Sequence, residues 1–149
     1  MARESALWKR VRGGGIALRK LGHKADLHRI ENAAGAGHPD VEGCINGGQV
    51  WVELKSCDRP KRATTCIRFR TNERTRKAQS RWHRERAEAG GRVHWVLVQV
   101  GESHQAALYL VAGKDYDLIE CPEDELLLMS CVSREAEPDE VLLRAAIGW

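Results

Sequence analysis

HPDVEGCINGGQVWVELKS, residues 38–56, is the stretch that decides the fold, because it places two carboxylates on either side of a glycine turn. Asn46-Gly47 is a strong signal for a two-residue hairpin turn, whose central residues both need positive φ angles. With this turn, the numbers of paired residues add up to 93, so Asp40 faces Glu53. Opposed Cβ atoms lie about 4.5–5.5 Å apart, where two acids repel unless a cation lies between them. The hairpin therefore predicts a metal ion at Asp40 and Glu53.

The alternation of side chains gives the two faces of this hairpin different characters. Side chains on a strand switch faces at every residue. The apolar face, which we expect to pack on the core, carries Val41, Ile45, Val50, Val52 and Leu54. The polar face carries Asp40, Glu42, Gln49, Trp51, Glu53 and Lys55. A turn centred on Gly47-Gly48 would instead place Glu53 opposite Glu42, but it would keep both faces, because that shift is even.

Pro39-Asp40, a spacer and then Glu53-Leu54-Lys55 on an apolar strand form the pattern of the PD-(D/E)xK nuclease superfamily, which this chain resembles. The wider context, RIENAAGAGHPDVEGCINGGQVWVELKS followed by RKAQSRW, is similar to small stand-alone VRR-NUC-type nucleases often encoded by phages, and more distantly to Holliday-junction resolvases. The resemblance covers roughly residues 1–100. Taken singly, a Pro-Asp pair such as Pro39-Asp40 is usually a turn. Glu53-Leu54-Lys55 alone is usually the solvated face of an amphipathic strand. The catalytic interpretation depends on their meeting on one face.

The residue types of this motif suit hydrolysis assisted by a divalent cation. Hard cations such as Mg²⁺ prefer oxygen ligands, which Asp40 and Glu53 would supply, and Mn²⁺ can substitute. Such a cation polarises a phosphate and acidifies a water. Lys55 would orient that water or help to deprotonate it, and would stabilise the developing negative charge. Glu42 and Glu31 are the alternative carboxylate ligands.

The resemblance adds three positions to the site. In this superfamily the main-chain carbonyl after the strand acid, here that of Leu54, commonly supplies a third metal ligand. Related resolvases add a glutamate from the first helix, which corresponds to Glu4 in RESALW. A lone early glutamate is also an ordinary charge at a helix N-terminus. Gln79 matches a glutamine that is common in this family after the motif. It would hold a ligand or contact a phosphate, and its alternative role is that of a helix-surface amide.

Composition indicates one domain without membrane or secretion signals. The 149 residues are 42% apolar, which is enough for a single packed core. No run approaches the ~18 apolar residues of a bilayer span, and the charged start MARESALWKRVRGGG lacks the apolar stretch of a signal peptide. Five cysteines without C-x-x-C spacing are typical of free thiols in a reducing compartment. We expect a cytoplasmic protein, in the host cytoplasm if a phage encodes it.

Charge is segregated along the chain. Residues 1–100 hold 21 Lys and Arg against 10 Asp and Glu, a net charge of +11, whereas residues 101–149 hold 3 against 11, a net charge of −8. The stretch 55–92 has 13 basic and 4 acidic residues, so the positive charge directly follows the motif. A field of this kind attracts polyanions, and we expect DNA, duplex or branched, as the partner.

The first half of the chain has a readable order of elements around the hairpin. We expect a helix over 3–12 that is broken at Gly13-Gly14-Gly15 and resumes to residue 20. A weak strand over 27–32 precedes the hairpin, and a short strand over 66–70 follows it.

The pattern after residue 71 predicts a long basic helix. Asn72 is a good N-cap, and the helix should run to Ala89 and end at Gly90-Gly91. One face of it carries a basic stripe, either solvated or in contact with phosphates, which consists of Arg74, Lys77, Arg81 and Arg84.

The second half completes an α/β pattern. Residues 92–100 are apolar on both faces, as in a central strand, and 106–112 should be its antiparallel neighbour. Leucine-rich helices are expected over 122–131 and 138–147. The order αβββαβ is that of the restriction-endonuclease-like core, with a mixed central sheet flanked by helices.

We expect residues 1–112 to form a nuclease core and residues 113–149 an acidic helical C-terminal extension of the same domain, kept off the DNA. The favoured function is a Mg²⁺-dependent endonuclease that hydrolyses DNA phosphodiester bonds, on branched or Holliday-junction DNA by analogy to the resolvases. One alternative is a catalytically inactive DNA-binding module on a nuclease scaffold. A protein-interaction module, which only the acidic helices favour, is another.

Paired incisions on opposing strands would require two copies of a single-site domain, so we expect a homodimer. The apolar side chains of the last two helices would either form the interface or pack on the domain's own sheet; they include Leu126, Leu127, Met129, Val141 and Leu142.

Overall fold

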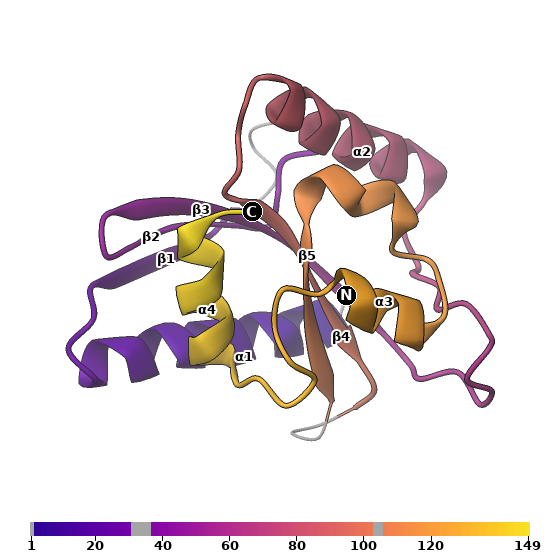
Figure 1. Ribbon diagram of the computed structural model, residues 1–149, viewed down its shortest axis with the longest axis horizontal. Helices are drawn as coiled ribbons and strands as arrows, with labels where there is room; N and C mark the ends of the chain where they lie inside the picture. Colours follow the sequence, from indigo (N-terminus) through magenta and orange to yellow (C-terminus); the bar gives the residue numbers. More distant parts are fainter. Residues whose placement is uncertain (1, 31–36, 103–105) are drawn as a thin grey trace.

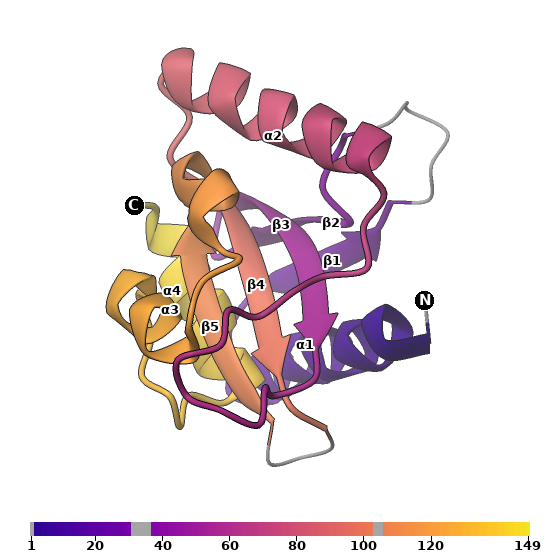
Figure 2. The ribbon, with the colours of Figure 1, turned by 90° about the vertical axis from the view of Figure 1, so that its right-hand side faces the viewer.

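One mixed five-stranded sheet, in the order β1-β2-β3-β4-β5, organises the chain in a computed structural model that describes residues 2–30, 37–102 and 106–149 (Figures 1 and 2). Only β3 and β4 run parallel, and the other neighbouring strands are antiparallel. The chain is thus α/β, as expected. Its elements are α1 (Ala2–Lys20), β1 (Ala25–Arg29), β2 (Val41–Ile45), β3 (Gly48–Cys57), α2 (Glu73–Glu88), β4 (His94–Val100), β5 (Ala107–Ala112), the 3₁₀ helix η2 (Gly113–Leu118), α3 (Glu123–Met129) and α4 (Pro138–Ile147).

The β2–β3 hairpin has the predicted turn and register. Asn46 and Gly47 both have positive φ angles, 51° and 85°, as this turn requires. Val41 pairs with Val52 and Ile45 with Gly48, which rules out the turn centred one residue later. The numbering of these pairs places Asp40 beside Glu53 where the ladder ends.

Helices cover both faces of the sheet. Figure 1 shows α1 beneath the sheet with α4 against it, and α2 on the opposite side. The apolar face of the hairpin packs on α1 and α4, and this part of the core includes Leu7, Leu18, Val41, Val52, Leu54, Val141 and Leu142. The opposite face of β4 and β5 packs on η2, α3 and the segment after β3, with Ile67, Val98, Tyr109, Tyr116 and Leu126 among its members. Glu53 and Lys55 of β3 are joined by hydrogen bonds to Gln79 of α2, which is in turn bonded to Tyr116 of η2.

The first helix is continuous, so the predicted break at its three glycines is wrong. A Cβ on Gly14 would come within 2.9 Å of Pro138, and one on Gly15 within 3.0 Å of Leu27. Gly13 has no neighbour within 4 Å of that position. Two of the three glycines therefore serve close packing of α1 on α4 and β1, which outweighs their poor helix propensity.

Two predicted strands need correction. The first strand begins at Ala25, earlier than residue 27, and ends at Arg29. The segment 66–70 is not a strand: its N–H groups make single bonds, from Ile67 to the carbonyl of Cys121 (3.0 Å) and from Phe69 to the Glu120 carboxylate (3.1 Å). Because these partners lie in a turn and not on a strand, no ladder forms.

The helix after residue 71 begins and ends as predicted, within one residue. Asn72 accepts a hydrogen bond from the N–H of Thr75 at 2.8 Å, the expected N-cap contact. Ala89 is the C-cap, and Gly90 follows with a φ of 90°.

The C-terminal helices pack on the chain's own sheet. Helix α4 has the predicted bounds, whereas α3 is shorter than predicted and η2 was not predicted at all. Leu126, Val141 and Leu142 are at most 2% exposed, and Leu127 and Met129 pack against the core. These apolar stripes are therefore not a free surface for a second copy. Within the described residues, no helix is both long enough and apolar enough to cross a membrane.

Candidate metal and phosphate site

The candidate site lies where β2 separates from β3. The register that pairs Val41 with Val52 would next oppose Leu54 to Pro39, which has no N–H to donate. The N–H of Leu54 instead donates to Oδ2 of Asp40 at 2.8 Å. The N–H and C=O of one strand residue point toward the same neighbouring strand. The Leu54 carbonyl therefore faces the side of Asp40, and Pro39 cannot donate to it.

Glu53 is a buried carboxylate with one oxygen held and one left over. Its side chain is 1% exposed, and Oε1 accepts a hydrogen bond from Nε2 of Gln79 at 2.6 Å. Oε2 is buried without a hydrogen-bond partner among the described residues. Burial and the neighbouring Asp40 raise the pKa of Glu53 well above its usual value, and the charge of Lys55 opposes this shift. A buried carboxylate with an unpaired oxygen is suited to bind a cation.

Lys55 is buried beside this carboxylate instead of lying on a solvated strand face. It is 3% exposed, and its Nζ donates to Oε1 of Gln79 (2.8 Å) and to Oγ1 of Thr71 (3.0 Å). The same Nζ lies 3.5 Å from Oε1 of Glu53. This burial results from α2 and the segment before it, which cover the polar face of β3 at this end.

Gln79 and Tyr116 complete the network. Gln79 is 7% exposed and faces the sheet, so it is not a surface amide. The hydroxyl of Tyr116 donates to Oε1 of Gln79 at 2.6 Å. Burial, and then the charge of Glu53, raise the pKa of Tyr116, so the hydroxyl keeps its proton. Sequence reasoning missed Tyr116 because no pattern marks η2, the short helix that carries it.

Two histidines lie behind this network. Nδ1 of His83 and Nδ1 of His94 are 2.9 Å apart, and Nε2 of His94 lies 3.1 Å from the carbonyl of Gly91. A carbonyl only accepts, so Nε2 of His94 carries a proton, and in the neutral pair His83 donates to His94. Burial, and then the nearby His94 and Lys55, lower the pKa of His83 to about 3. The pair is neutral at physiological pH.

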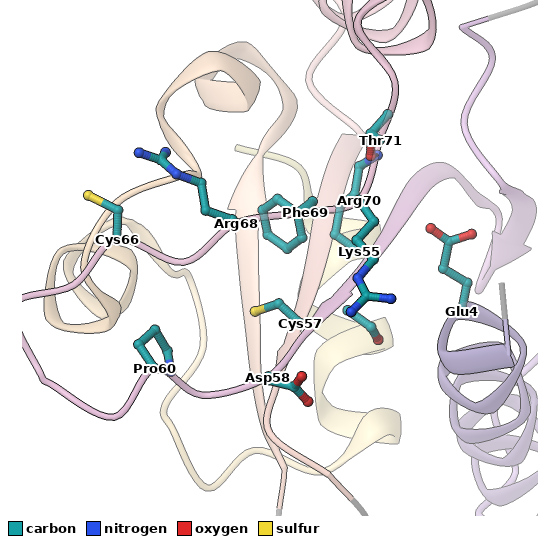
Figure 3. Close-up of a pocket in the computed structure, with 11 residues that line it drawn as sticks. Glu4, Lys55, Cys57, Asp58, Pro60, Cys66, Arg68, Phe69, Arg70 and Thr71 are labelled. Carbon is teal, nitrogen blue, oxygen red and sulfur yellow. Dashed lines mark hydrogen bonds between the residues drawn. The ribbon is translucent and has the colours of Figure 1, made fainter.

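A cleft of about 440 Å³ opens beside Lys55 (Figure 3). Glu4 of α1 lies at one side of the cleft. Arg68, Arg70 and Thr71, from the segment that leads to α2, line it as well. The predicted Glu4 is thus near Lys55. Within the described part of the chain, no three His, Cys, Asp or Glu side chains form a group that could hold a metal, so Glu4 is not grouped with the two carboxylates.

Of the two alternative carboxylate ligands, Glu42 and Glu31, the structure describes only Glu42. Glu42 pairs with Trp51 across the hairpin, two residue pairs away from the Asp40–Glu53 position. Glu31 lies outside the described residues.

The basic stripe of α2 is exposed to solvent. All four of its side chains, Arg74, Lys77, Arg81 and Arg84, are exposed, while Gln79 and His83 on the same helix face the sheet. Lys77 forms an exposed ion pair with Glu73 at 3.2 Å. The stripe and the buried network thus occupy opposite faces of one helix.

No protein-family model matches this chain, and no curated protein matches it.

Proposed function

We propose that this protein is a divalent-metal-dependent endonuclease that hydrolyses DNA phosphodiester bonds. The observation that carries the proposal is the convergence of Asp40, Glu53 and Lys55 at the end of one hairpin, where Oε2 of Glu53 has no hydrogen-bond partner among the described residues. The large majority of buried side-chain polar atoms in folded proteins have a hydrogen-bond partner, so a buried carboxylate oxygen without one calls for an explanation, which a bound cation supplies. A metal-binding carboxylate requires such an oxygen.

The donor set fits Mg²⁺, with Mn²⁺ as a substitute. Asp40 and Glu53 offer carboxylate oxygens and Leu54 a main-chain carbonyl, and a hard cation prefers oxygen donors and retains several waters. Glu4 lines the cleft beside Lys55 but is not grouped with Asp40 and Glu53 among the described residues, so it would act as a ligand only if α1 moved toward them. When bound, the cation supplies charge stabilisation at the phosphate and a more acidic water.

The chain's own residues have separate tasks in this proposal. Gln79 holds Oε1 of Glu53, which leaves Oε2 for the cation. Lys55 presents its ammonium beside Glu53, where it can orient the attacking water and stabilise negative charge on the phosphate. Arg68 and Arg70 line the adjacent cleft and would hold the flanking phosphates.

The substrate and the assembly belong to the same proposal. The exposed basic stripe of α2 favours a polyanion, and we propose duplex or branched DNA such as a Holliday junction, cut by a homodimer that provides one site per strand. Cys44, Cys66, Cys121 and Cys131 are thiols that form no disulfide within the described residues, which supports a cytoplasmic location, including that of a phage host.

Incubation with plasmid, linear duplex and four-way junction, each with Mg²⁺, Mn²⁺ or EDTA, tests this function. The proposal predicts cleavage with either cation and none in EDTA. DNA binding without cleavage under all conditions would favour the inactive DNA-binding module. Neither binding nor cleavage would favour a protein-interaction module.

A further inference from the structure

The amide of Gln79 is held by three partners. Its Oε1 accepts from Nζ of Lys55 (2.8 Å) and from the hydroxyl of Tyr116 (2.6 Å), and its Nε2 donates to Oε1 of Glu53 (2.6 Å). Glutamine has three rotatable side-chain bonds, so its position depends on such contacts. In the proposed function, Lys55 and Glu53 also interact with phosphate and metal. Tyr116 is the partner that has no other task there.

Tyr116 is itself held firmly. Its side chain is 5% exposed, and its ring stacks on that of His83, with centroids 5.4 Å apart and planes 18° from parallel. His83 stacks in turn on His94 at 5.2 Å. The ring therefore has little freedom, and its hydroxyl is a fixed donor aimed at the amide of Gln79.

We propose that Tyr116 is a positioning residue for the metal site, which acts through Gln79. With the amide anchored, Nε2 holds Oε1 of Glu53, and Oε2 is left as the oxygen available to the cation. The inference rests on the proposed function, because it assumes a cation at Glu53. It also assigns part of the site to η2, outside the segment that resembles the nuclease superfamily.

The chain offers a matched control in its second tyrosine. Tyr109 is 0% exposed, and its hydroxyl also donates to a side-chain oxygen at 2.6 Å, that of Glu123. Both tyrosines are buried and both hydroxyls donate a hydrogen bond at 2.6 Å, although the hydroxyl of Tyr109 also accepts one from Nε of Arg134 at 3.2 Å. Of the two, Tyr116 is the one whose hydrogen bond leads through Gln79 to Glu53. Replacing each by phenylalanine removes one hydroxyl and keeps the aromatic ring.

Calorimetric titration of the DNA-free protein with Mn²⁺ tests the inference. Residues that orient metal ligands typically change metal affinity by 10–100-fold when mutated, so Tyr116→Phe should bind Mn²⁺ about tenfold more weakly. Tyr109→Phe should bind it as the wild type does. Circular dichroism and melting curves verify that both variants are folded.

A double-mutant cycle with Gln79→Ala tests whether Tyr116 acts on the metal site through Gln79. Because Tyr116 acts through Gln79, Tyr116→Phe should add nothing in the Gln79→Ala background. Wild-type Mn²⁺ affinity in Tyr116→Phe, or additive losses in the double variant, would overturn the inference.

The result for the wild type separates this inference from the proposed function. A wild type that binds Mn²⁺ but cleaves no DNA would overturn the proposed function, and the cycle would still decide the role of Tyr116. A wild type that cleaves DNA while the cycle is additive would overturn only the inference. A folded wild type that binds no Mn²⁺ at millimolar concentration would overturn both.

Discussion

Folding and the proposed chemistry require different protonation states of Glu53. The folded, metal-free protein favours the protonated acid, whereas a metal ligand must be ionised. The folded pKa of Glu53 lies above the ordinary value of 4.5 because of burial and the neighbouring Asp40. A raised pKa means that the folded state favours the protonated form. The contribution of Glu53 to stability is therefore fully present below pH 4.5 and is lost as the pH rises through the folded pKa. The metal-free protein at neutral pH is destabilised by this carboxylate.

Glu53→Gln should consequently stabilise the protein in EDTA. The variant cannot ionise at this position, so its melting temperature should exceed that of the wild type at pH 7, and the difference should shrink toward pH 4. Differential scanning calorimetry across this range measures the effect. Adding Mg²⁺ should raise the melting temperature of the wild type and not that of the variant, because only the wild type retains the ligand. A difference that is independent of pH would contradict the account.

The predictability of the site differs from residue to residue. The pairing of Asp40 with Glu53 could be predicted because a local turn, Asn46-Gly47, sets the register. The bond between Tyr116 and Gln79 joins residues 37 positions apart, and no periodic signal marks either partner. The burial of Lys55 was also not evident, because it depends on how α2 lies over the sheet.

At the scale of elements, the glycines of α1 show why propensity alone misled. Gly13 and Gly14 are neighbours in one helix, yet only Gly14 lies against α4. Gly13→Ala should stabilise the protein by roughly 0.5–1 kcal/mol, because alanine loses less backbone entropy in a helix. Gly14→Ala should destabilise it, because the new Cβ would lie 2.9 Å from Pro138.

Chemical denaturation measures the free energy of unfolding of Gly13→Ala and Gly14→Ala, and each variant serves as the control for the other. The same sign for the two substitutions would mean that α1 and α4 do not pack as described.

The order of elements was otherwise accessible from sequence, since β3, β4 and α2 have strong periodic or capping signals. The segment 66–70 has neither, and its extended path depends on the distant turn at Cys121.

The basic stripe of α2 supports a prediction about DNA binding. Charge reversal of Lys77 and Arg81 should weaken affinity for every DNA alike, because interactions with phosphates carry no sequence information. The slope of log affinity against log salt should become shallower by about one for each phosphate that is no longer neutralised. Titrations at several salt concentrations measure both quantities. Reversal of the exposed Arg12 and Lys20 on α1 is the matched control, and equal effects of the two pairs would show that only net charge matters.

The whole molecule combines a basic first part with an acidic last part that folds back on the same sheet. Helices α3 and α4 pack onto the core through leucines that include Leu126 and Leu142. Those leucines are therefore unavailable as the interface of a homodimer. The large apolar side chains that remain exposed among the described residues are Ile16, Leu21, Leu118, Leu128 and Ile147.

Static light scattering tests the proposed assembly. The proposal predicts a mass of two 16.7 kDa chains, free or bound to DNA, because symmetric incision requires two sites. A monomer in both states would leave a nicking or nonspecific nuclease as the better account.

The central claim is that Asp40, Glu53 and Lys55 form a hydrolytic centre, and cleavage kinetics of matched variants test it most directly. Single-turnover cleavage and DNA affinity should be measured with Mg²⁺ for the wild type, Asp40→Asn, Glu53→Gln and Lys55→Ala, with Glu42→Gln as the control from the same hairpin face. The account predicts that both carboxylate variants lose cleavage and bind DNA as tightly as the wild type or more tightly. Lys55→Ala should slow cleavage by orders of magnitude, and Glu42→Gln should cleave normally. Near-wild-type cleavage by Asp40→Asn or Glu53→Gln would contradict the account.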